Sequence, residues 1–166
     1  MASDLDLSAY RPNVGIVLFN RDGRVWYGRR ANASPPHNWQ FPQGGVDEGE
    51  ELQDAARREL AEETGVSSTS FLARTESWIA YDFPPGADRG RKGWKGQKQI
   101  WFALRFEGHD HEIDLTAHHH VEFDAWRWGR LDEATGLIVP FKRKAYAQVV
   151  KAFSHLAEGA PMGGRS

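Results

Sequence analysis

The sequence contains no cysteine among its 166 residues. Disulfide bonds, zinc sites built on thiolates and a cysteine nucleophile are therefore excluded. The sequence also lacks any apolar run near the ~18 residues that a membrane helix needs. Residues 1–6 are acidic, whereas an export signal would begin basic and then turn apolar. These absences predict a cytoplasmic protein with no membrane partner.

Neither sign of charge dominates. Lys and Arg number 21 against 23 Asp and Glu, which gives a formal net charge of −2. Such a balance gives no global reason to expect nucleic-acid or membrane binding, and DNA is not expected as a partner. The length predicts a single domain over residues 10–157. A polar segment, 1–9, and a tail rich in Gly and Pro, 158–166, are expected to be flexible.

Two helices are predicted. Residues 50–64 are rich in Glu, Ala, Leu and Arg, which favour helices, and Gly65 stands where a glycine stops one. Residues 141–157 carry Tyr146, Val149 and Phe153 at helical spacing. Apolar and alternating runs predict strands at 14–19, 25–28, 71–81, 97–106 and 123–128, a short extended piece at 39–42 and a tight turn at 43–45. The fold class expected is α/β, with a mixed sheet covered by helices on both faces.

Three carboxylates of the first predicted helix share one face. Glu59, Glu62 and Glu63 fall within an arc of roughly 100° on the side where Ala55 and Ala56 also lie. Like charges at this spacing repel one another, so a cation is expected to compensate them. Oxygen ligands favour Mg²⁺ or Mn²⁺, and Mg²⁺ in turn favours phosphate substrates. The alternative is an ordinary, solvated helix surface.

The residues around these carboxylates make a known pattern. Gly44 and Glu50 precede Arg58-Glu59-Leu60, and Glu62-Glu63 and Gly65-Val66 follow, at the spacing of a complete Nudix box. The chain thus resembles the Nudix hydrolases over roughly residues 10–155. Segments 10–15, 39–45, 96–102, 122–128 and 141–143 are similar to those of a narrower branch, the bacterial RNA pyrophosphohydrolases and dinucleoside polyphosphate hydrolases.

The resemblance implies a Nudix α/β/α sandwich and hydrolysis of a nucleoside diphosphate linked to another group. It also implies that Glu59, Glu62 and Glu63 bind Mg²⁺, for which Mn²⁺ or another divalent cation can substitute. Arg58 would orient these carboxylates by ion pairing and Glu50 would support the start of the helix. The Gly44 carbonyl and Glu122 are further implied ligands. Whether Glu122 or a box glutamate such as Glu59 removes the proton from the attacking water stays open.

The same resemblance implies a nucleotide pocket lined by Arg11, Arg30, Tyr81, Phe141 and Lys142. Taken from the residues alone, Arg11 and Arg30 could instead brace the first hairpin, and Phe141 could belong to the core.

Two further segments have ambiguous chemistry. Residues 88–98 hold five cations against the single carboxylate of Asp88, with Trp94 among them. Such a stretch suits a polyphosphate or a single-stranded 5′ end, and it also suits a solvated loop. His118, His119 and His120 are consecutive and cannot all face one ion, so a polar loop is expected there in preference to a zinc site.

Three activities are compatible with the sequence. The first is a Mg²⁺-dependent RNA 5′ pyrophosphohydrolase, which removes pyrophosphate from triphosphorylated RNA. The second is a dinucleoside polyphosphate hydrolase that splits diadenosine tetraphosphate. The third is a nucleotide-binding module without turnover, which the intact carboxylates of the box disfavour. The substrate is expected to be a nucleotide polyphosphate or a 5′-triphosphorylated RNA, and no protein partner is indicated.

Overall fold

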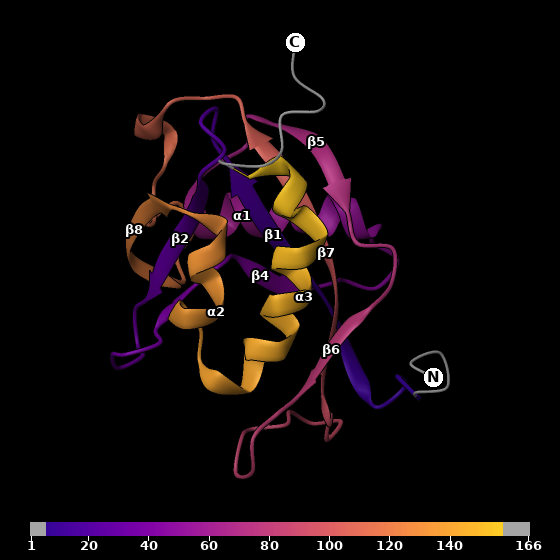
Figure 1. Ribbon diagram of the computed structural model, residues 1–166. Helices are drawn as coiled ribbons and strands as arrows, with labels where there is room; N and C mark the ends of the chain where they lie inside the picture. The colour runs from indigo at the N-terminus through magenta and orange to yellow at the C-terminus, as the bar shows by residue number, and fades with distance from the viewer. Residues whose placement is uncertain (1–5, 158–166) are drawn as a thin grey trace.

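The computed structural model describes residues 6–157; residues 1–5 and the predicted tail 158–166 lie outside the described part. One mixed sheet forms the centre of the molecule (Figure 1). Its strands are β1 (Tyr10–Phe19), β2 (Val25–Arg30), β3 (Trp39–Gln40), β4 (Gln43–Gly45), β5 (Thr69–Arg74), β6 (Ile79–Asp82), β7 (Gly96–Phe106) and β8 (Phe123–Gly129).

The sheet is organised around the parallel pair of β1 and β7. Their register runs from Tyr10 opposite Gly96 to Phe19 opposite Arg105, and every other pair is antiparallel. The main path is β3-β2-β1-β7-β5, with β4 on β1, β6 on β7 and β8 on β2. Two strands from distant parts of the chain therefore fix the position of everything that pairs with them.

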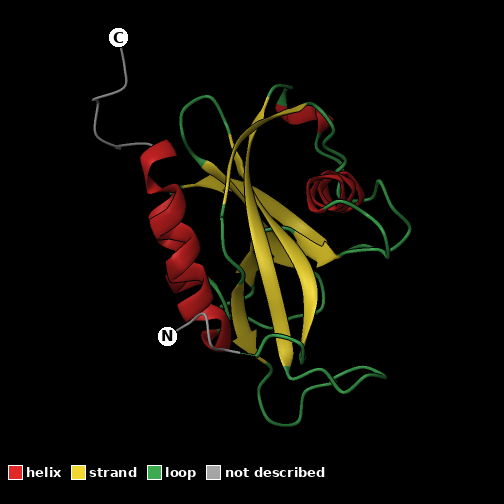
Figure 2. Cartoon of the chain, turned by 90° about the vertical axis from the view of Figure 1, so that its right-hand side faces the viewer, coloured by secondary structure: helices red, strands yellow, loops and turns green. Residues whose placement is uncertain are grey.

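Helices cover both faces of this sheet (Figure 2). Alternation along β1 sends Val14 and Ile16 into one apolar cluster and Val17 and Phe19 into the other. Helix α1 (Leu52–Thr64) packs on the first face, and α3 (Arg143–Phe153) with the short α2 (Ala134–Leu137) packs on the second. The predicted α/β sandwich is confirmed.

Helix α1 matches its prediction closely. It begins at Leu52, two residues after the predicted start, and ends at Thr64, where it is followed by Gly65 with a φ of 76°. The Gly65 N–H donates to the Ala61 carbonyl at 2.9 Å, so the glycine closes the last turn in a conformation that other residues rarely adopt. The predicted helix at 141–157 is shorter than expected, because 3₁₀ turns at Pro140–Lys142 and Ser154–Leu156 flank α3.

The prediction of a tight turn at residues 43–45 was wrong. These residues form β4, in which Gly44 pairs with Val14 and Gln43 with Gly15. Neither Gly44 nor Gly45 has a positive φ. The missing side chain of Gly44 leaves room for Glu59 of α1, and that of Gly45 leaves room for Arg11, so neither glycine serves to reverse the chain.

The predicted strand 71–81 is two strands. β5 pairs with the second half of β7 and β6 pairs with its first half, with the chain leaving the sheet between them. The four residues of α2 and the 3₁₀ turns at Asp110–Glu112 and Leu131–Glu133 had no sequence prediction. Within residues 6–157, no helix combines the length and apolarity required to cross a membrane.

Candidate active site

Strand β4 lies directly against helix α1, and the contact depends on glycine. A Cβ placed on Gly44 would stand 2.0 Å from the carboxyl carbon of Glu59. A side chain at this position would displace the Glu59 carboxylate, so the bare backbone of β4 forms one wall of a site whose other wall is the acidic face of α1. The Gly44 carbonyl, predicted as a metal ligand, belongs to this wall.

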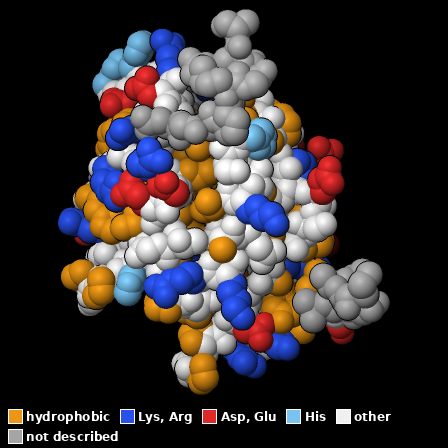
Figure 3. All heavy atoms as spheres, in the orientation of Figure 1, with side chains coloured by type: hydrophobic (Ala, Val, Ile, Leu, Met, Phe, Trp, Pro, Cys, Tyr) orange, Lys and Arg blue, Asp and Glu red, His pale blue; other side chains and the backbone are white. Residues whose placement is uncertain are grey.

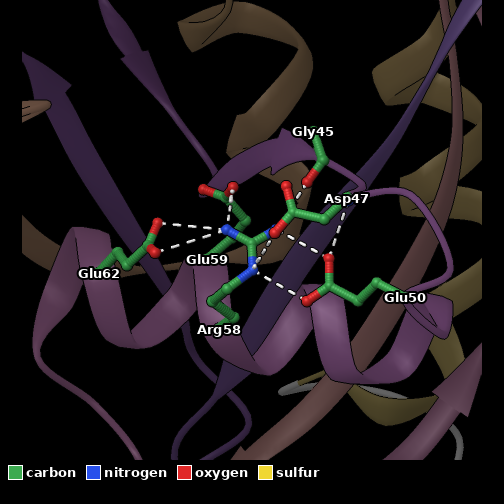
Figure 4. A network of polar contacts seen from close by, with 6 residues as sticks. All are labelled: Gly45, Asp47, Glu50, Arg58, Glu59 and Glu62. Atoms are coloured by element: carbon green, nitrogen blue, oxygen red, sulfur yellow. Dashed lines mark hydrogen bonds and ion pairs between the residues drawn. The ribbon is translucent and has the colours of Figure 1, made fainter.

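Arg58 is the hub of a network of polar contacts between β4 and α1 (Figure 4). Its Nε and Nη2 donate to the two oxygens of Glu50 at 2.9 and 3.0 Å, and Nη2 also donates to the Gly45 carbonyl at 2.9 Å. Its Nη1 donates to Glu59 Oε1 at 2.9 Å and approaches Glu62 at 3.4 Å. The guanidinium of Arg58 thus connects β4, the strand that contains Gly44 and Gly45, to two of the predicted metal ligands. We call β4 the glycine strand.

Glu50 is held as a carboxylate by this arrangement. The hydrogen bonds from Arg58 and from the Asp47 N–H lower the pKa of Glu50 to about 2. Glu50 therefore keeps its charge across the physiological range and fixes the position of Arg58.

Glu63 is compensated far less, because a hydrogen bond from the Gln43 backbone is outweighed by burial. Its Oε1 is completely buried and has no hydrogen-bond partner within residues 6–157. Burial, followed by the charges of Glu122 and Glu59, raises the pKa of Glu63 well above its usual value. Burial also raises the pKa of Glu59, against the opposing effect of Arg58. These shifts mark a cluster of carboxylates that carries more negative charge than its protein surroundings stabilise.

The structure brings all the predicted metal ligands to one cleft of about 290 Å³. Its lining is Gln43, Gly44, Gly45, Glu59, Glu62, Glu63, His118, His120 and Glu122. The two histidines were not among the predicted site residues. His120 Nε2 lies 3.5 Å from Glu122 Oε2, and the only signal in the sequence was that the two are separated by one residue.

The donor set of this cleft fits a divalent cation. It offers several carboxylates and a backbone carbonyl, which are hard oxygen ligands, and one of its oxygens is buried without a partner. The side chains are not drawn around a common point: in the described part of the chain, no group of three or more His, Asp or Glu stands ready to hold a metal. Two of the carboxylates, Glu59 and Glu62, point toward Arg58, whose Nη1 lies 2.9 and 3.4 Å from them.

Residues of the predicted nucleotide pocket meet beside Gln43. The Tyr81 and Phe141 rings lie 5.8 Å apart, and Lys142 Nζ is 5.4 Å from the first ring centroid and 5.9 Å from the second. Lys142 Nζ also donates to Gln43 Oε1 at 3.4 Å. Burial, and next the nearby positive charge of Arg30, lower the pKa of Lys142 to about 8. Phe141 is exposed, so the alternative that it belongs to the core was wrong.

The fifth residue predicted for this pocket is Arg11. It faces Gly45, where an added Cβ would come within 2.9 Å of Arg11 Nη2. It also lines a second cavity, of about 770 Å³, together with residues of the 88–94 loop. Arg11 therefore lines a cavity whose lining does not include Arg30, Tyr81, Phe141 or Lys142.

A chain of amide side chains near the site escaped the sequence analysis. Gln99, which is buried, donates to Asn13 Oδ1 at 2.8 Å and to Gln43 Oε1 at 3.3 Å. Gln43 in turn donates to Gln97 Oε1 at 3.4 Å, and the Tyr81 hydroxyl donates to the same oxygen. Polar residues inside the apolar run 97–106 were the available signal. This chain links the ring of Tyr81 to the glycine strand.

Known proteins resemble this chain over most of its length. A protein-family model described as NUDIX domain matches residues 9–149. The "RNA pyrophosphohydrolase" of Caulobacter vibrioides is 64% identical over 160 residues, covering 95% of this chain and 93% of that relative. A relative of the same name from Rhizobium meliloti is 50% identical over 158 residues, covering 89% and 95%. Among solved structures, a C. elegans Ap4A hydrolase shares the fold with a TM-score of 0.62 at 19% identity, covering 87% of this chain and 98% of that one.

Replacing Glu63 by Gln should make the metal-free protein more stable at neutral pH. The folded state raises the pKa of Glu63 above its ordinary value of 4.5, so the wild type loses stability as the pH rises from that value through the folded pKa. A neutral amide removes this loss. Urea unfolding in a chelator should show the variant above the wild type at about pH 7, with the difference disappearing near about pH 4.

The matched control for this measurement is Glu76→Gln, which changes an exposed glutamate outside the cleft and should leave stability unaltered. A Glu63→Gln variant no more stable than the wild type at neutral pH would show that the carboxylate is not electrostatically strained.

Proposed function

The chain belongs to the NUDIX domain family, and on that premise we propose that it removes pyrophosphate from the 5′ end of triphosphorylated RNA, leaving a 5′ monophosphate. The observation that carries the proposal is the cleft between β4 and α1, where four glutamates face a glycine strand next to a buried lysine. Two relatives at 64% and 50% identity, which bear the name RNA pyrophosphohydrolase, support this choice of substrate.

Proteins of this family use divalent cations. We assign Mg²⁺, or Mn²⁺ in its place, to Glu59, Glu62, Glu63 and Glu122 with the Gly44 carbonyl. A cation there would supply charge neutralisation at the phosphoryl oxygens and would lower the pKa of a bound water. It would also remove the repulsion that raises the pKa of Glu63.

The chain's own residues divide the remaining tasks. Water attacks phosphorus in line, the anhydride bond between the α and β phosphates breaks, and pyrophosphate leaves. A carboxylate must take the proton from that water. Between the two candidates, Arg58 Nη1 holds Glu59 at 2.9 Å, whereas Glu122 Oε2 lies 3.5 Å from His120 Nε2. We therefore assign to Glu122 the removal of the proton from the attacking water. Arg58 orients Glu59 and Glu62.

The group beside Gln43 suits the nucleotide end of the substrate. Lys142 and Arg30 provide two positive charges for phosphate, and the Tyr81 and Phe141 rings flank the lysine. An aromatic ring can stack on a base of any identity, so this pocket holds a nucleotide without requiring one sequence.

Parallel assays would test the proposed function. Purified protein with Mg²⁺ is offered triphosphorylated RNA, diadenosine tetraphosphate and oxidised deoxynucleoside triphosphates, and kcat/KM ranks them. We expect RNA to rank first, and Glu59→Gln and Glu63→Gln each to lower turnover by about 100-fold or more. A higher rank for the dinucleotide would assign the second activity, and near-normal turnover in either folded variant would contradict the site.

Lys142 should act in binding more than in chemistry. Lys142→Ala is expected to raise KM more than it lowers kcat. Because the pKa of Lys142 is lowered to about 8, the wild type should bind substrate more weakly as the pH rises through that value and the ammonium loses its proton.

The control for this pH effect is Lys142→Arg, which stays charged at alkaline pH. Its KM should remain flat over the range in which the wild-type KM rises. If both proteins show the same rise, the titrating group is another one.

A further inference from the structure

We propose that the cavity beside Arg11 binds the single-stranded RNA that follows the 5′ end. The inference rests on the proposed function, since it names the part of the substrate that lies beyond the reacting phosphates. It assigns a role to residues 88–94, which the site described above leaves unused.

The cavity is built by three segments that lie far apart in the sequence. Its volume is about 770 Å³, within the range of sites that hold a nucleotide-sized ligand. The lining comes from the start of β1, the stretch after β4 and the loop before β7, namely Arg11, Pro12, Val46, Glu48, Phe83, Asp88, Arg89, Gly90, Arg91, Lys92 and Trp94.

This cavity adjoins the carboxylate cleft through one strand. Arg11 lines the cavity and faces Gly45, and Gly45 lines the cleft. A polymer whose phosphates lie among the glutamates of the cleft would therefore meet Arg11 on leaving it. This continuity makes the cavity an extension of the site.

The loop contributes three cations that lack a counter-ion in the described part of the chain. Within the described range 6–157, Arg89, Arg91 and Lys92 form no ion pair, and Asp88 accepts a hydrogen bond from the Gly90 N–H at 2.9 Å. Lys and Arg side chains also gather over the lower part of the face seen in Figure 3, toward the end of the molecule where this loop projects in Figure 1. Unpaired cations of this kind suit backbone phosphates.

Trp94 adds a surface for a base. It is half-buried at the cavity, and Lys92 Nζ lies 5.6 Å from its ring centroid. The loop is anchored: Trp94 N–H donates to the Arg89 carbonyl at 3.0 Å, and Lys95 N–H donates to the Ala9 carbonyl at 2.8 Å. Cations beside an aromatic ring in a held loop make the arrangement with which proteins bind single strands without reading their sequence.

The test compares a long substrate with a short one. The triple variant R89A/R91A/K92A is assayed on a triphosphorylated RNA of about 12 nucleotides and on a triphosphorylated dinucleotide, at several salt concentrations. We expect kcat/KM on the long RNA to fall about tenfold or more at low salt and to stay within about twofold on the dinucleotide. The slope of log kcat/KM against log salt for the long RNA should shrink by about 2, since each lost phosphate contact removes ~0.7.

Trp94 is tested separately by two substitutions. Trp94→Leu should weaken use of the long RNA by about fivefold or more, and Trp94→Phe should restore most of it, because a phenyl ring still stacks. Equal losses for both would assign Trp94 to the support of the loop and would remove the base from the proposal.

The matched control is R21A/R105A/K151A, which removes three exposed cations outside this cavity. The inference is overturned if the control loses as much on the long RNA as the loop variant does. It is also overturned if the loop variant loses equally on both substrates, which would place the 5′ end itself in the cavity. If the wild type hydrolyses neither RNA, the proposed function fails, and binding of the 3′-labelled 12-mer to both variants decides the inference alone.

Discussion

The site depends on an electrostatic conflict confined to one face of α1. Glu59, Glu62 and Glu63 line one cleft beside β4, and Arg58 contacts two of them. Arg58 is already shared with Glu50 and the Gly45 carbonyl, so its charge is divided. The raised pKa values of Glu59 and Glu63 reflect the negative charge that the protein does not neutralise. A fold that retains such a cluster sacrifices stability for chemistry, because burial penalises charge.

Strand β4 gives the acidic face of α1 a fixed opposite wall. Its pairing with β1 fixes the three residues from Gln43 to Gly45 between the two covered faces of the sheet. Gly44 has no side chain, so the Glu59 carboxylate can lie against the backbone. Gln43, its neighbour, accepts from Lys142. The glutamates that would hold the metal ion and the basic side chain that would bind the substrate thus both lie next to β4. This arrangement brings opposite charges near the same phosphates.

The sequence predicted the parts of the molecule that local physics determines. The helix at 50–64 and its stop at Gly65 follow from propensity and from the conformational freedom of glycine, and both were confirmed. The spacing of the box glutamates predicted that they share one face, and the structure places them on one cleft. The resemblance to the Nudix hydrolases supplied the residues beyond the helix, such as Glu122, which no local pattern singles out.

Features that depend on pairing between distant strands could not be predicted from local sequence. Residues 43–45 look like a turn locally, and only the partner strand β1 makes them extended. The break between β5 and β6 follows from their pairing with separate halves of β7. The cavity lined by Arg11 likewise arises because the pairing of β1 with its partner strands brings the start of β1 to the loop before β7, which spacing along the chain does not encode.

Binding of Mn²⁺ in solution tests most directly whether the acidic face of α1 is a cation site. Electron paramagnetic resonance can count the ions taken up by the wild type and by a Glu59→Gln/Glu63→Gln double variant at the same total metal. The wild type should bind Mn²⁺ at this site, Mg²⁺ should displace it, and the double variant should lose that uptake. Equal uptake by the two proteins would contradict the assignment of the cation to this helix.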